Sequence, residues 1–533
     1  MKINSAFLKD TLLPILFLLV GLYAMPLRIM DGFNYIPGDF GDARFNMYIL
    51  EHGHNFLRGE VDSFWDADFL YPSESVVAFS DNLLGTMPVY SLFRLLTFDN
   101  YTSFQLWILS LFALNYFLCF LALKKWFSNS IVAIIGSYIF AFGIFNIGQI
   151  YHVQVFPRFM IPITLYWFWK YLNDQKIRTI TLTSLGVAYQ FYCGIYLGFF
   201  LIYGLIFSLV AYLIVYNKGF IKRLFNKHSI FHLFLSISIL FICLYPLFYN
   251  YLKVAKEFGL REFENIYATI PFISSYFFSS PTSIPWGGML YAHSAYQYDQ
   301  WWLHLLFPGI TPWLSFLIFP IILYKDKPSI KKLGLFLFCL LVLSFAFSLR
   351  NNDFSLFKWI YKIPGFSSMR AIVRIVNVQV FILILFLSYC LNRLSVLYPK
   401  TKVLMIFFLA FVLFDNSFRV DEGVKRYNKE ESIAQVEHFK ESINKHDFSN
   451  YEAIAVGLPD EVKHDHAKVI VYHVGIMLAS QELGVKCVNG YTGNYPDNYM
   501  QFFDYSNQET LHNYISQSTD KSIDNILFIQ LDN

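Results

Sequence analysis

The sequence predicts a multi-span α-helical membrane protein that ends in a small extracytoplasmic α/β domain. Composition is the first reason, because 56% of the 533 residues are hydrophobic and only 15% are charged, whereas soluble proteins average about 25% charged residues. Charge placement is the second, because the net charge is +11 over residues 1–416 and −8 over residues 417–533. No basic surface exceeds what membrane topology requires, so we expect no nucleic-acid partner.

Long apolar runs are the third reason, and they place the spans. A helix crosses the hydrocarbon core with roughly 17 to 25 apolar residues. This length fits about eleven segments, near residues 11–28, 102–123, 129–148, 156–172, 179–195, 196–216, 229–252, 304–324, 333–349, 375–392 and 403–416. The first run is interpreted as an uncleaved span rather than a signal peptide, because ten more hydrophobic segments follow and no A-x-A-like site precedes Arg28.

Basic residues in the connections predict the orientation. One set of connections, around residues 2–9, 124–125, 176–178, 218–227, 325–332 and 393–402, carries 17 basic and 3 acidic residues. The positive-inside rule places this set in the cytoplasm. The opposite face receives the loops 31–101, 149–155, 253–303 and 350–374 and, because the span count is odd, residues 417–533. We expect a multi-pass membrane protein with its C-terminal domain outside the cytoplasm.

The polar tail has the pattern of a small α/β domain that begins after Asn416. The periodicity predicts a helix near 430–446, a strand near 452–457, a strand and helix around 468–483, a strand at 485–488 and a last strand at 526–531. Five of the six cysteines lie in apolar runs and only Cys487 lies in the tail, so we expect no disulfide framework.

The first external loop carries the candidate catalytic carboxylates in the segment GDFGDARFNMYILEH. Asp39 and Asp42 each follow a glycine closely, and Ala43–Leu57 has the spacing of an amphipathic helix that could lie in the membrane interface. A carboxylate at the membrane surface can act as a general base. Asp42 is the first candidate and Asp39 the second; the alternative is that they are solvated or cap the helix. Glu51 and His52 are candidate substrate-binding residues.

Metal and nucleotide motifs are sparse. Asp66 and Asp68 form a D-x-D pair that could ligate a divalent cation. The sequence shows no required cofactor and no assigned metal site, and a divalent cation is left open. Walker A, G-x-G-x-x-G, H-E-x-x-H and G-x-S-x-G motifs are absent from the sequence. An activated donor is therefore expected to arrive through the membrane rather than as a nucleotide.

Other external loops supply candidate binding residues. His152 and Arg158, in GQIYHVQVFPR, are candidate donor-binding residues; the alternative is an interfacial histidine with a snorkelling arginine. Glu262 is a candidate substrate-binding residue. Three tryptophans of the loop 253–303 could form a sugar platform or belong to an aromatic belt, namely Trp286, Trp301 and Trp302.

Arg370 and Arg374, in KIPGFSSMRAIVR, are candidate donor-binding residues. Their i, i+4 spacing predicts that both lie on one helix face, with Ser367 or Ser368 capping a helix N-terminus that favours an anion. A planar guanidinium fork suits a phosphate group. The alternative is snorkelling to lipid phosphates or pairing with acidic loop residues.

The tail segment VNGYTGNYPDNY contains turn-forming glycines and a proline. We expect it to fold back over the membrane cavity and to place Tyr491, a candidate substrate-binding residue, on the acceptor side. The alternative is an ordinary loop of the α/β domain.

The segments GDFGDARFNMYILEH, AFSDNLLGTMP, PGFSSMRAIVR and VNGYTGNYP, together with the predicted architecture, make the chain resemble the C-type glycosyltransferase superfamily (GT-C), here a bacterial polytopic protein. The resemblance implies transfer of a sugar from a polyprenyl-phosphate-linked donor to a cell-envelope glycan or lipid, such as O-antigen or another polysaccharide, on the external face. It also implies a catalytic aspartate close to the first span, which Asp42 matches and Asp39 matches less well.

Two other functions stay open from the sequence. One is a lipid-linked glycan transporter or flippase, and the other is a glycan polymerase or ligase on the same face. Transporters usually place ionisable groups near the middle of their spans. The predicted spans are nearly free of charge, which favours the enzyme.

Overall fold

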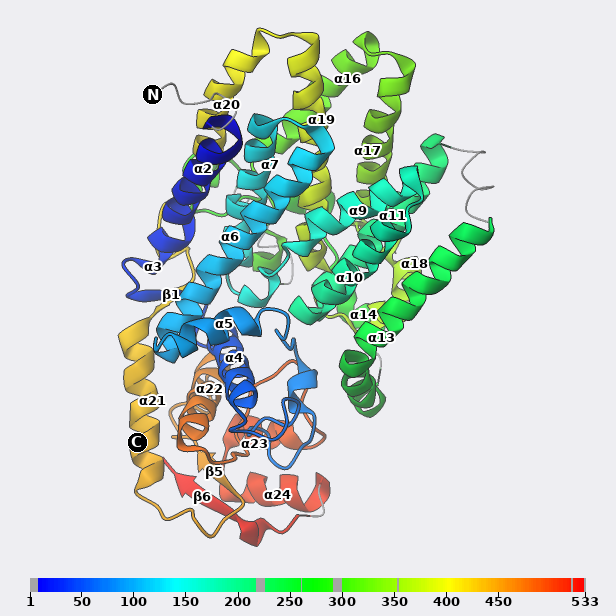
Figure 1. Cartoon of the computed structure of the whole chain (residues 1–533). Helices are drawn as coiled ribbons and strands as arrows, with labels where there is room; N and C mark the ends of the chain where they lie inside the picture. Colours follow the sequence, from blue (N-terminus) through cyan, green and yellow to red (C-terminus); the bar gives the residue numbers. More distant parts are fainter. Residues whose placement is uncertain are drawn as a thin grey trace.

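The computed structural model describes residues 8–216, 226–259, 261–290, 300–351, 354–518 and 521–531. A bundle of long helices forms the larger part, and a smaller unit, built from the first external loop and the tail, lies against one end of it (Figure 1). The prediction of a mostly helical chain with several long apolar helices is confirmed.

The bundle helices coincide with the predicted spans. They are the stretch Asp10–Met30, which includes α2 (Leu13–Leu22) and α3 (Arg28–Met30), then α6 (Asn100–Phe127), α7 (Ser130–Phe142) with α8 (Phe145–Gln149), α9 (Met160–Asp174), α10 (Ile177–Cys193), α11 (Ile195–Tyr216), α13 (Lys227–Phe258), α16 (Ser315–Lys325), α17 (Pro328–Ala346), α19 (Val376–Leu397) and α20 (Thr401–Asp415). Within the described residues, seven of these are long and apolar enough to cross a membrane, and α9, α10, α16 and α20 are shorter. The count of eleven spans stays a prediction.

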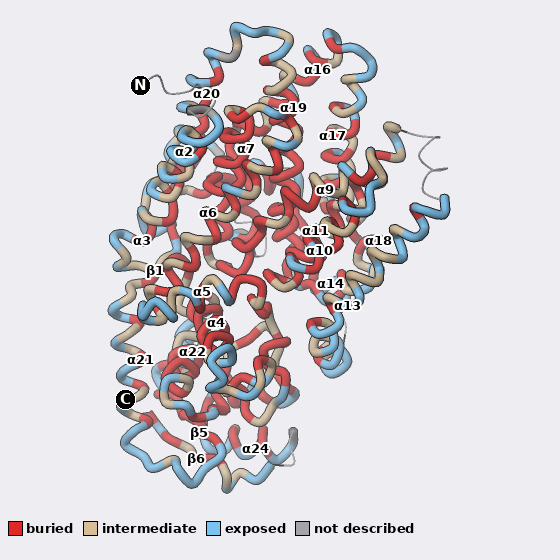
Figure 2. The backbone as a smooth tube through the Cα atoms, viewed as in Figure 1, coloured by how far each residue is buried: buried red, intermediate tan, exposed pale blue. Residues whose placement is uncertain are grey.

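Burial separates central from peripheral helices. Every residue in the most apolar stretch of α19 is buried, because its surface is apolar on all sides. In α13 only 17% of the corresponding residues are buried, so this helix exposes large apolar side chains at the edge of the bundle (Figure 2). That exposure is what a helix in contact with lipid requires.

The basic connections meet at one end of the bundle. Lys124 at the end of α6 donates to Asp10 (2.7 Å), and Arg393 after the middle of α19 makes two hydrogen bonds to Asp326 at the end of α16 (2.6 and 2.8 Å). Lys2, Lys218, Lys222 and Arg223 lie outside the described residues. The external loops and the tail lie at the opposite end (Figure 1). Which end faces the cytoplasm stays a prediction.

The first external loop contains β1 (Tyr35–Pro37), α4 (Asp42–Arg58) and α5 (Met87–Leu95). The expectation that the helix after Asp42 lies in the membrane interface is wrong. Residues 43–54 of α4 are all buried, because α5 packs on this helix from the bundle side and the tail covers the rest. Phe56 and Leu57, at the end of α4, are its exposed apolar residues.

The tail contains β4 (Arg426–Asn428), α21 (Lys429–Asn444), β5 (Ala453–Gly457), α22 (His466–Leu483), α23 (Tyr499–Tyr505), α24 (Gln508–Ser518) and β6 (Ile526–Gln530). β5 and β6 pair in parallel, with Ala453 beside Ile526. The predicted strand at 485–488 is reduced to a single bridge between Cys487 and Ile454. The helices α23 and α24 were not predicted, because their short segments mix aromatic and polar residues without a clear period.

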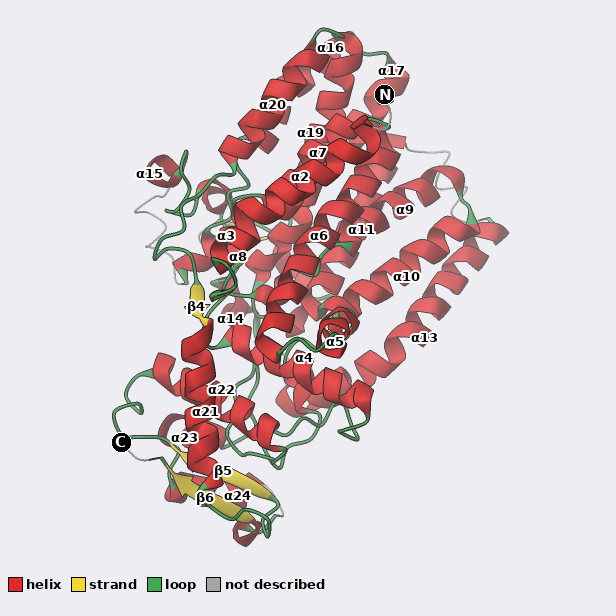
Figure 3. Ribbon diagram, turned by 60° about the vertical axis from the view of Figure 1, so that its left-hand side comes forward, coloured by secondary structure: helices red, strands yellow, loops and turns green. Residues whose placement is uncertain are grey.

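The tail and the first external loop share one core (Figure 3). β1 pairs with β4 in antiparallel register, with Tyr35 opposite Asn428. Cys487 donates its amide to Asp68 (2.7 Å) and accepts the amide of Tyr71 (3.0 Å). The composition shift after Asn416 therefore marks the end of the bundle, but residues 417–533 are not packed as a separate unit.

The remaining short elements lie in the first external loop and in the other external loops. These are the 3₁₀ turns Val76–Phe79, Val153–Val155, Ile273–Phe277, Trp301–His304, Thr311–Leu314, Phe366–Ser368 and Ile372–Ile375, the helices α14 (Phe263–Tyr267), α15 (Gly287–Leu290) and α18 (Phe357–Tyr361), and the antiparallel pair β2 (Arg350–Asn351) and β3 (Phe354–Ser355).

Labelling from one side of the membrane tests the orientation. Glu441 in α21 and Lys327 before α17 are both exposed, at opposite ends of the molecule. In spheroplasts, a membrane-impermeant maleimide should react with Glu441→Cys and not with Lys327→Cys, because the positive-inside rule puts Lys327 in the cytoplasm. Permeabilised cells, in which both variants should react, are the control. Labelling of Lys327→Cys alone in spheroplasts would reverse the orientation.

Candidate active site

A cavity of about 880 Å³ lies where the bundle meets the first external loop and the tail. Residues of six segments form its wall. They are Asp42, Phe45 and 78–81 of the first loop, Gln154 between α8 and α9, residues 195–199 of α11, residues between 248 and 265 at and after the end of α13, residues between 365 and 374, and 491–495 of the tail. Its volume is in the range of small-molecule sites, which typically measure about 300–1,000 Å³.

Asp42 is the first residue of α4 and reaches the cavity because two glycines shape the turn before it. Gly38 has φ +111°, a conformation that side chains disfavour. At Gly41 an added Cβ would lie 2.9 Å from Ile470 of α22, so the missing side chain lets the tail pack against the turn. The tight path predicted for these glycines therefore has a tertiary cause as well.

Two distant segments converge on the Asp42 carboxylate. Its Oδ2 accepts hydrogen bonds from His152 Nδ1 (2.6 Å) and Gln154 Nε2 (3.4 Å), and its Oδ1 accepts one from the Tyr491 hydroxyl (2.6 Å). The predicted fold-back of the tail segment over the cavity is therefore confirmed, while the role of Tyr491 on the acceptor side stays a prediction. The Asp42 side chain is 16% exposed.

The surroundings keep Asp42 ionised. Burial alone would raise its pKa, but the hydrogen bonds from His152 and Tyr491 and the charge of Arg374 outweigh burial and hold the pKa well below its usual range. Burial and the charge of Arg374 lower the pKa of His152. The hydrogen bond from His152 to Asp42 uses the proton on Nδ1.

Asp39 lies close to Asp42 in the same turn, but it does not line the cavity. Its Oδ1 accepts the amide of Gly41 (3.1 Å). Burial and then the neighbouring charge of Asp42 raise the pKa of Asp39 to about 6. The structure therefore brings both predicted carboxylates together, with Asp42 alone facing the cavity.

Arg370 and Arg374 both line the cavity. Arg374 is buried, with its guanidinium carbon 5.1 Å from the centre of the Tyr196 ring, and its Nε has no hydrogen-bond partner. Arg370 is exposed, and its backbone amide donates to the Tyr196 hydroxyl (2.9 Å). Neither side chain makes an ion pair within 4.0 Å to a carboxylate in the part of the chain that the structure describes.

The helix predicted to carry these two arginines is absent. Met369 and Ala371 are extended, a 3₁₀ turn begins at Ile372, and Ser367 and Ser368 belong to an earlier turn rather than a cap. The segment takes this path because Thr269 binds it on both sides, with its hydroxyl donating to the carbonyl of Arg370 (3.0 Å) and its carbonyl accepting the amide of Val373 (2.9 Å). The two arginines reach one cavity without sharing a helix face.

Of the other predicted binding residues, the structure places one at the cavity and the rest away from its wall. Glu262 is exposed and lines the cavity, whereas His152 contacts Asp42 from outside the cavity wall. Arg158 does not snorkel to the surface; it is buried in the bundle, where it binds Asn377, Asn146 and the carbonyl of Phe140. His52 is buried against the carbonyl of Phe64 (3.0 Å) and does not line the cavity.

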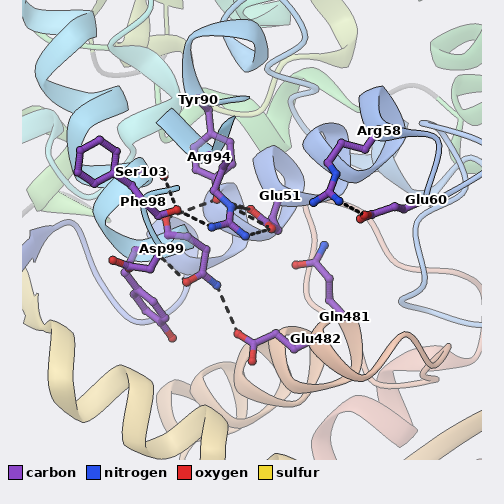
Figure 4. A network of polar contacts seen from close by, with 12 residues as sticks. Glu51, Arg58, Glu60, Tyr90, Arg94, Phe98, Asp99, Ser103, Gln481 and Glu482 are labelled. Atoms are coloured by element: carbon purple, nitrogen blue, oxygen red, sulfur yellow. Dashed lines mark hydrogen bonds and ion pairs between the residues drawn. The ribbon is translucent and has the colours of Figure 1, made fainter. Parts of the chain in front are cut away.

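Glu51 takes part in an ion-pair network away from the cavity (Figure 4). Arg94 of α5 binds both of its carboxylate oxygens (2.9 Å each), and the Tyr90 hydroxyl donates to one of them (2.5 Å). The Glu51 side chain therefore links α4 to α5 and does not face the cavity.

Sequence reasoning missed several cavity residues. Asp81 is buried in the cavity wall, where its Oδ1 accepts the amide of Ile195 at the start of α11 (2.9 Å). Burial raises the pKa of Asp81. Gln154, Arg261 and Asn494 also line the cavity. Their only sequence signal is that they lie in polar external segments, because no local spacing shows that these segments meet.

No group of three or more His, Cys, Asp or Glu side chains is placed to hold a metal ion within the described ranges. Asp66 instead accepts hydrogen bonds from the Ser63 hydroxyl (2.8 Å) and the Ser75 amide (2.6 Å). The D-x-D pair is thus used in local structure, and Asp68 does not line the cavity. Metal dependence stays open.

The predicted tryptophan platform is not part of this cavity. Trp286 donates its indole N–H to Asp415 (2.7 Å), and Trp301 contacts Trp302 edge to face. None of the three lines the cavity.

No family model matches the chain, and no curated protein sequence matches it. Among solved structures it is similar to arabinofuranosyltransferase AftD from mycobacteria, with a TM-score of 0.52 at 13% identity over 86% of this chain. The chain has the GT-C fold. It spans 30% of the length of AftD.

Two further solved structures of GT-C proteins align with the chain at 13% identity. ArnT from Cupriavidus metallidurans, bound to undecaprenyl phosphate, has a TM-score of 0.44 over 90% of this chain and 72% of its own. The archaeal oligosaccharyltransferase AglB from Archaeoglobus fulgidus, in complex with an inhibitory peptide and a dolichol-phosphate, has a TM-score of 0.46 over 91% of this chain and 65% of its own.

The Glu51 network predicts a stability effect without a binding effect. Arg94→Ala leaves the buried Glu51 carboxylate without its cation, which should cost about 2–3 kcal/mol of folding stability. We expect a lower thermal unfolding midpoint in detergent, and Arg58→Ala, which removes an exposed arginine of α4, is the matched control. An unchanged midpoint together with lost activity would instead assign Glu51 to the substrate.

Proposed function

We propose that this protein is a glycosyltransferase of the bacterial inner membrane, which moves one sugar from a polyprenyl-phosphate-linked donor to a hydroxyl of a cell-envelope glycan or lipid on the external face. The observation that carries the proposal is the pairing of groups in one cavity. An ionised carboxylate, Asp42, and a buried guanidinium with an unpartnered N–H, Arg374, line the same space. Glycosyl transfer from a phosphate needs a base for the acceptor and a cation for the leaving group.

In the proposed step, the acceptor oxygen attacks the anomeric carbon of the donor sugar. The bond from that oxygen to the sugar forms while the bond from the sugar to the phosphate oxygen breaks, with inversion at the anomeric carbon. The acceptor proton passes to Asp42 Oδ1. The electron pair of the broken bond stays on the lipid phosphate as it leaves.

Asp42 must lose a hydrogen bond to be an effective base. Its pKa is depressed in the resting site by the donors described above, and a weakly basic carboxylate accepts a proton poorly. His152 binds Oδ2 from outside the cavity wall and Gln154 binds it from within the wall, so both orient the side chain. Displacement of Tyr491 from Oδ1 by an acceptor hydroxyl would raise the basicity of the oxygen that receives the proton.

The arginines fit the donor phosphate. Arg374 already offsets the charge of Asp42, it lines the cavity, and its buried Nε has no hydrogen-bond partner. Arg370 adds a second guanidinium from the same segment. A guanidinium binds phosphate oxygens in pairs, which gives both affinity and orientation.

Access from the membrane supports a lipid-linked donor. Phe248 and Leu252 of α13 line the cavity, and they also line a hollow of about 1010 Å³ along the exposed apolar face of the same helix. The apolar chain of a lipid-linked donor could therefore lie along α13, in contact with lipid, while its phosphate group reaches the arginines in the cavity.

Asp42→Asn keeps the shape of the side chain and removes the base. Transfer of labelled sugar should fall by about 10²- to 10⁴-fold, measured in detergent-solubilised membranes from cells that carry only the variant. Detergent also separates an enzyme from a flippase, because product formation there requires chemistry rather than transport.

Asp39→Asn is the matched control, because Asp39 lies beside Asp42 but outside the cavity wall. It should retain most of the transfer activity. If Asp39→Asn abolished transfer and Asp42→Asn did not, the base would be Asp39; if neither changed it, the proposed function would fail.

Arg374→Lys keeps the charge and removes the planar fork. We expect a large rise in the donor concentration that gives half-maximal rate, with acceptor dependence little changed, because only the phosphate contact is altered. Arg58→Lys, at the exposed end of α4, is the control. Normal donor dependence in an Arg370→Ala, Arg374→Ala double variant would remove both arginines from the donor site.

A further inference from the structure

The tail segment from Gly490 to Tyr495, here called the Tyr491 loop, covers the reacting oxygen of Asp42. We propose that the Tyr491 hydroxyl occupies the place of the acceptor hydroxyl, and that a donor phosphate releases the loop by taking Arg261 from Asn494. The proposal rests on the proposed function and adds two residues to it. It assigns Arg261 to the phosphate site and makes donor binding the step that opens the acceptor site.

The hydroxyl of Tyr491 is chemically the group that an acceptor would offer. It donates one hydrogen bond to Asp42 Oδ1, the oxygen that His152 and Gln154 leave free. Among the described residues, Tyr491 is the one that contacts Oδ1 by a hydrogen bond. A sugar hydroxyl, which also has one donor and two lone pairs, would compete for the same position.

Asn494 fastens the loop across the cavity. Its amide nitrogen donates to the carbonyl of Phe79 in the first external loop (3.0 Å), and its amide oxygen accepts a hydrogen bond from Arg261 (2.7 Å). On the tail side the loop is held by weaker bonds, from the Gly490 amide to His473 Nδ1 (3.3 Å) and from the Tyr491 amide to the Met477 sulfur (3.2 Å). Loss of the Arg261 contact would therefore loosen the side of the loop that faces the cavity.

Arg261 lines the cavity and makes no ion pair within 4.0 Å to any carboxylate of the described chain. Burial and the nearby charge of Arg370 lower the pKa of Arg261, and both residues line the same cavity. A phosphate offers a guanidinium two anionic oxygens at once, whereas Asn494 offers Arg261 one neutral oxygen. A phosphate held at Arg370 would therefore outcompete Asn494 for Arg261.

Ser80 and Gly493 offer a reporter of loop position. A Cβ built on Gly493 lies 3.9 Å from the Cβ of Ser80, within the separation of about 3.5–4.5 Å that disulfides span. The six natural cysteines are buried or half-buried. In the Ser80→Cys, Gly493→Cys variant, the rate of disulfide formation reports how often the loop is closed.

The disulfide experiment compares two lipids added in detergent. Undecaprenyl phosphate is the probe for the donor phosphate, and uncharged undecaprenol is the control. We expect undecaprenyl phosphate to slow disulfide formation several-fold and undecaprenol to leave it unchanged. Adding Arg261→Gln, which removes the charge, should abolish the effect of the phosphate lipid. An unchanged rate in the presence of bound undecaprenyl phosphate, with binding verified by mass spectrometry, would overturn the release step. Failure of the lipid to bind at all would overturn the donor assignment and the proposed function with it.

Hydrogen exchange on the wild-type protein gives the same test without any substitution. Undecaprenyl phosphate should speed exchange of the backbone amides in the Tyr491 loop, and slower or unchanged exchange with the lipid bound would contradict the proposal. The disulfide also tests the acceptor assignment. The oxidised variant should lose sugar transfer, and dithiothreitol should restore it, whereas full transfer by the locked protein would show that Tyr491 does not occupy the acceptor position.

Discussion

The hydrogen bonds that converge on Asp42 are the interaction on which the site depends. A nearly buried carboxylate is stable as an anion only when donors replace water. Here the donors come from the loop between α8 and α9 and from the tail, at sequence distances of 110 and 449 residues. One charge therefore fixes the relative position of three distant parts of the chain.

This convergence explains why the tail does not form a separate unit. The tail must present Tyr491 to Asp42, and it does so by packing α22 against α4 and by pairing β4 with β1 directly before the Asp42 turn. Gly41 leaves the space in which Ile470 of α22 makes this contact. The bundle contributes Arg374 at the start of its most deeply buried helix, so the charge that offsets Asp42 is held on a rigid element.

The sequence predicts those features that arise from local composition. Apolar length locates the bundle helices, and α10 and α11 are separate helices, as the two predicted spans 179–195 and 196–216 require. Asp42 could be singled out because it lies early in the first loop after span one and directly follows a glycine, and Tyr491 because it lies in a turn rich in glycine and proline. Burial of α4 could not be predicted, because one of the helices that cover it, α22, begins more than 400 residues later in the chain. Asp81 and Arg261 have no local pattern, and the extended path around Arg370 is set by Thr269, which is distant in sequence.

The most direct test of the central claim is an electron density map of the protein with bound undecaprenyl phosphate. The claim is that one cavity presents a base to the acceptor and arginines to the donor phosphate. The phosphate should lie within hydrogen-bond distance of the Arg374 guanidinium, with Asp42 facing the same space. Phosphate density elsewhere, with the Arg374 guanidinium still unpartnered, would contradict it.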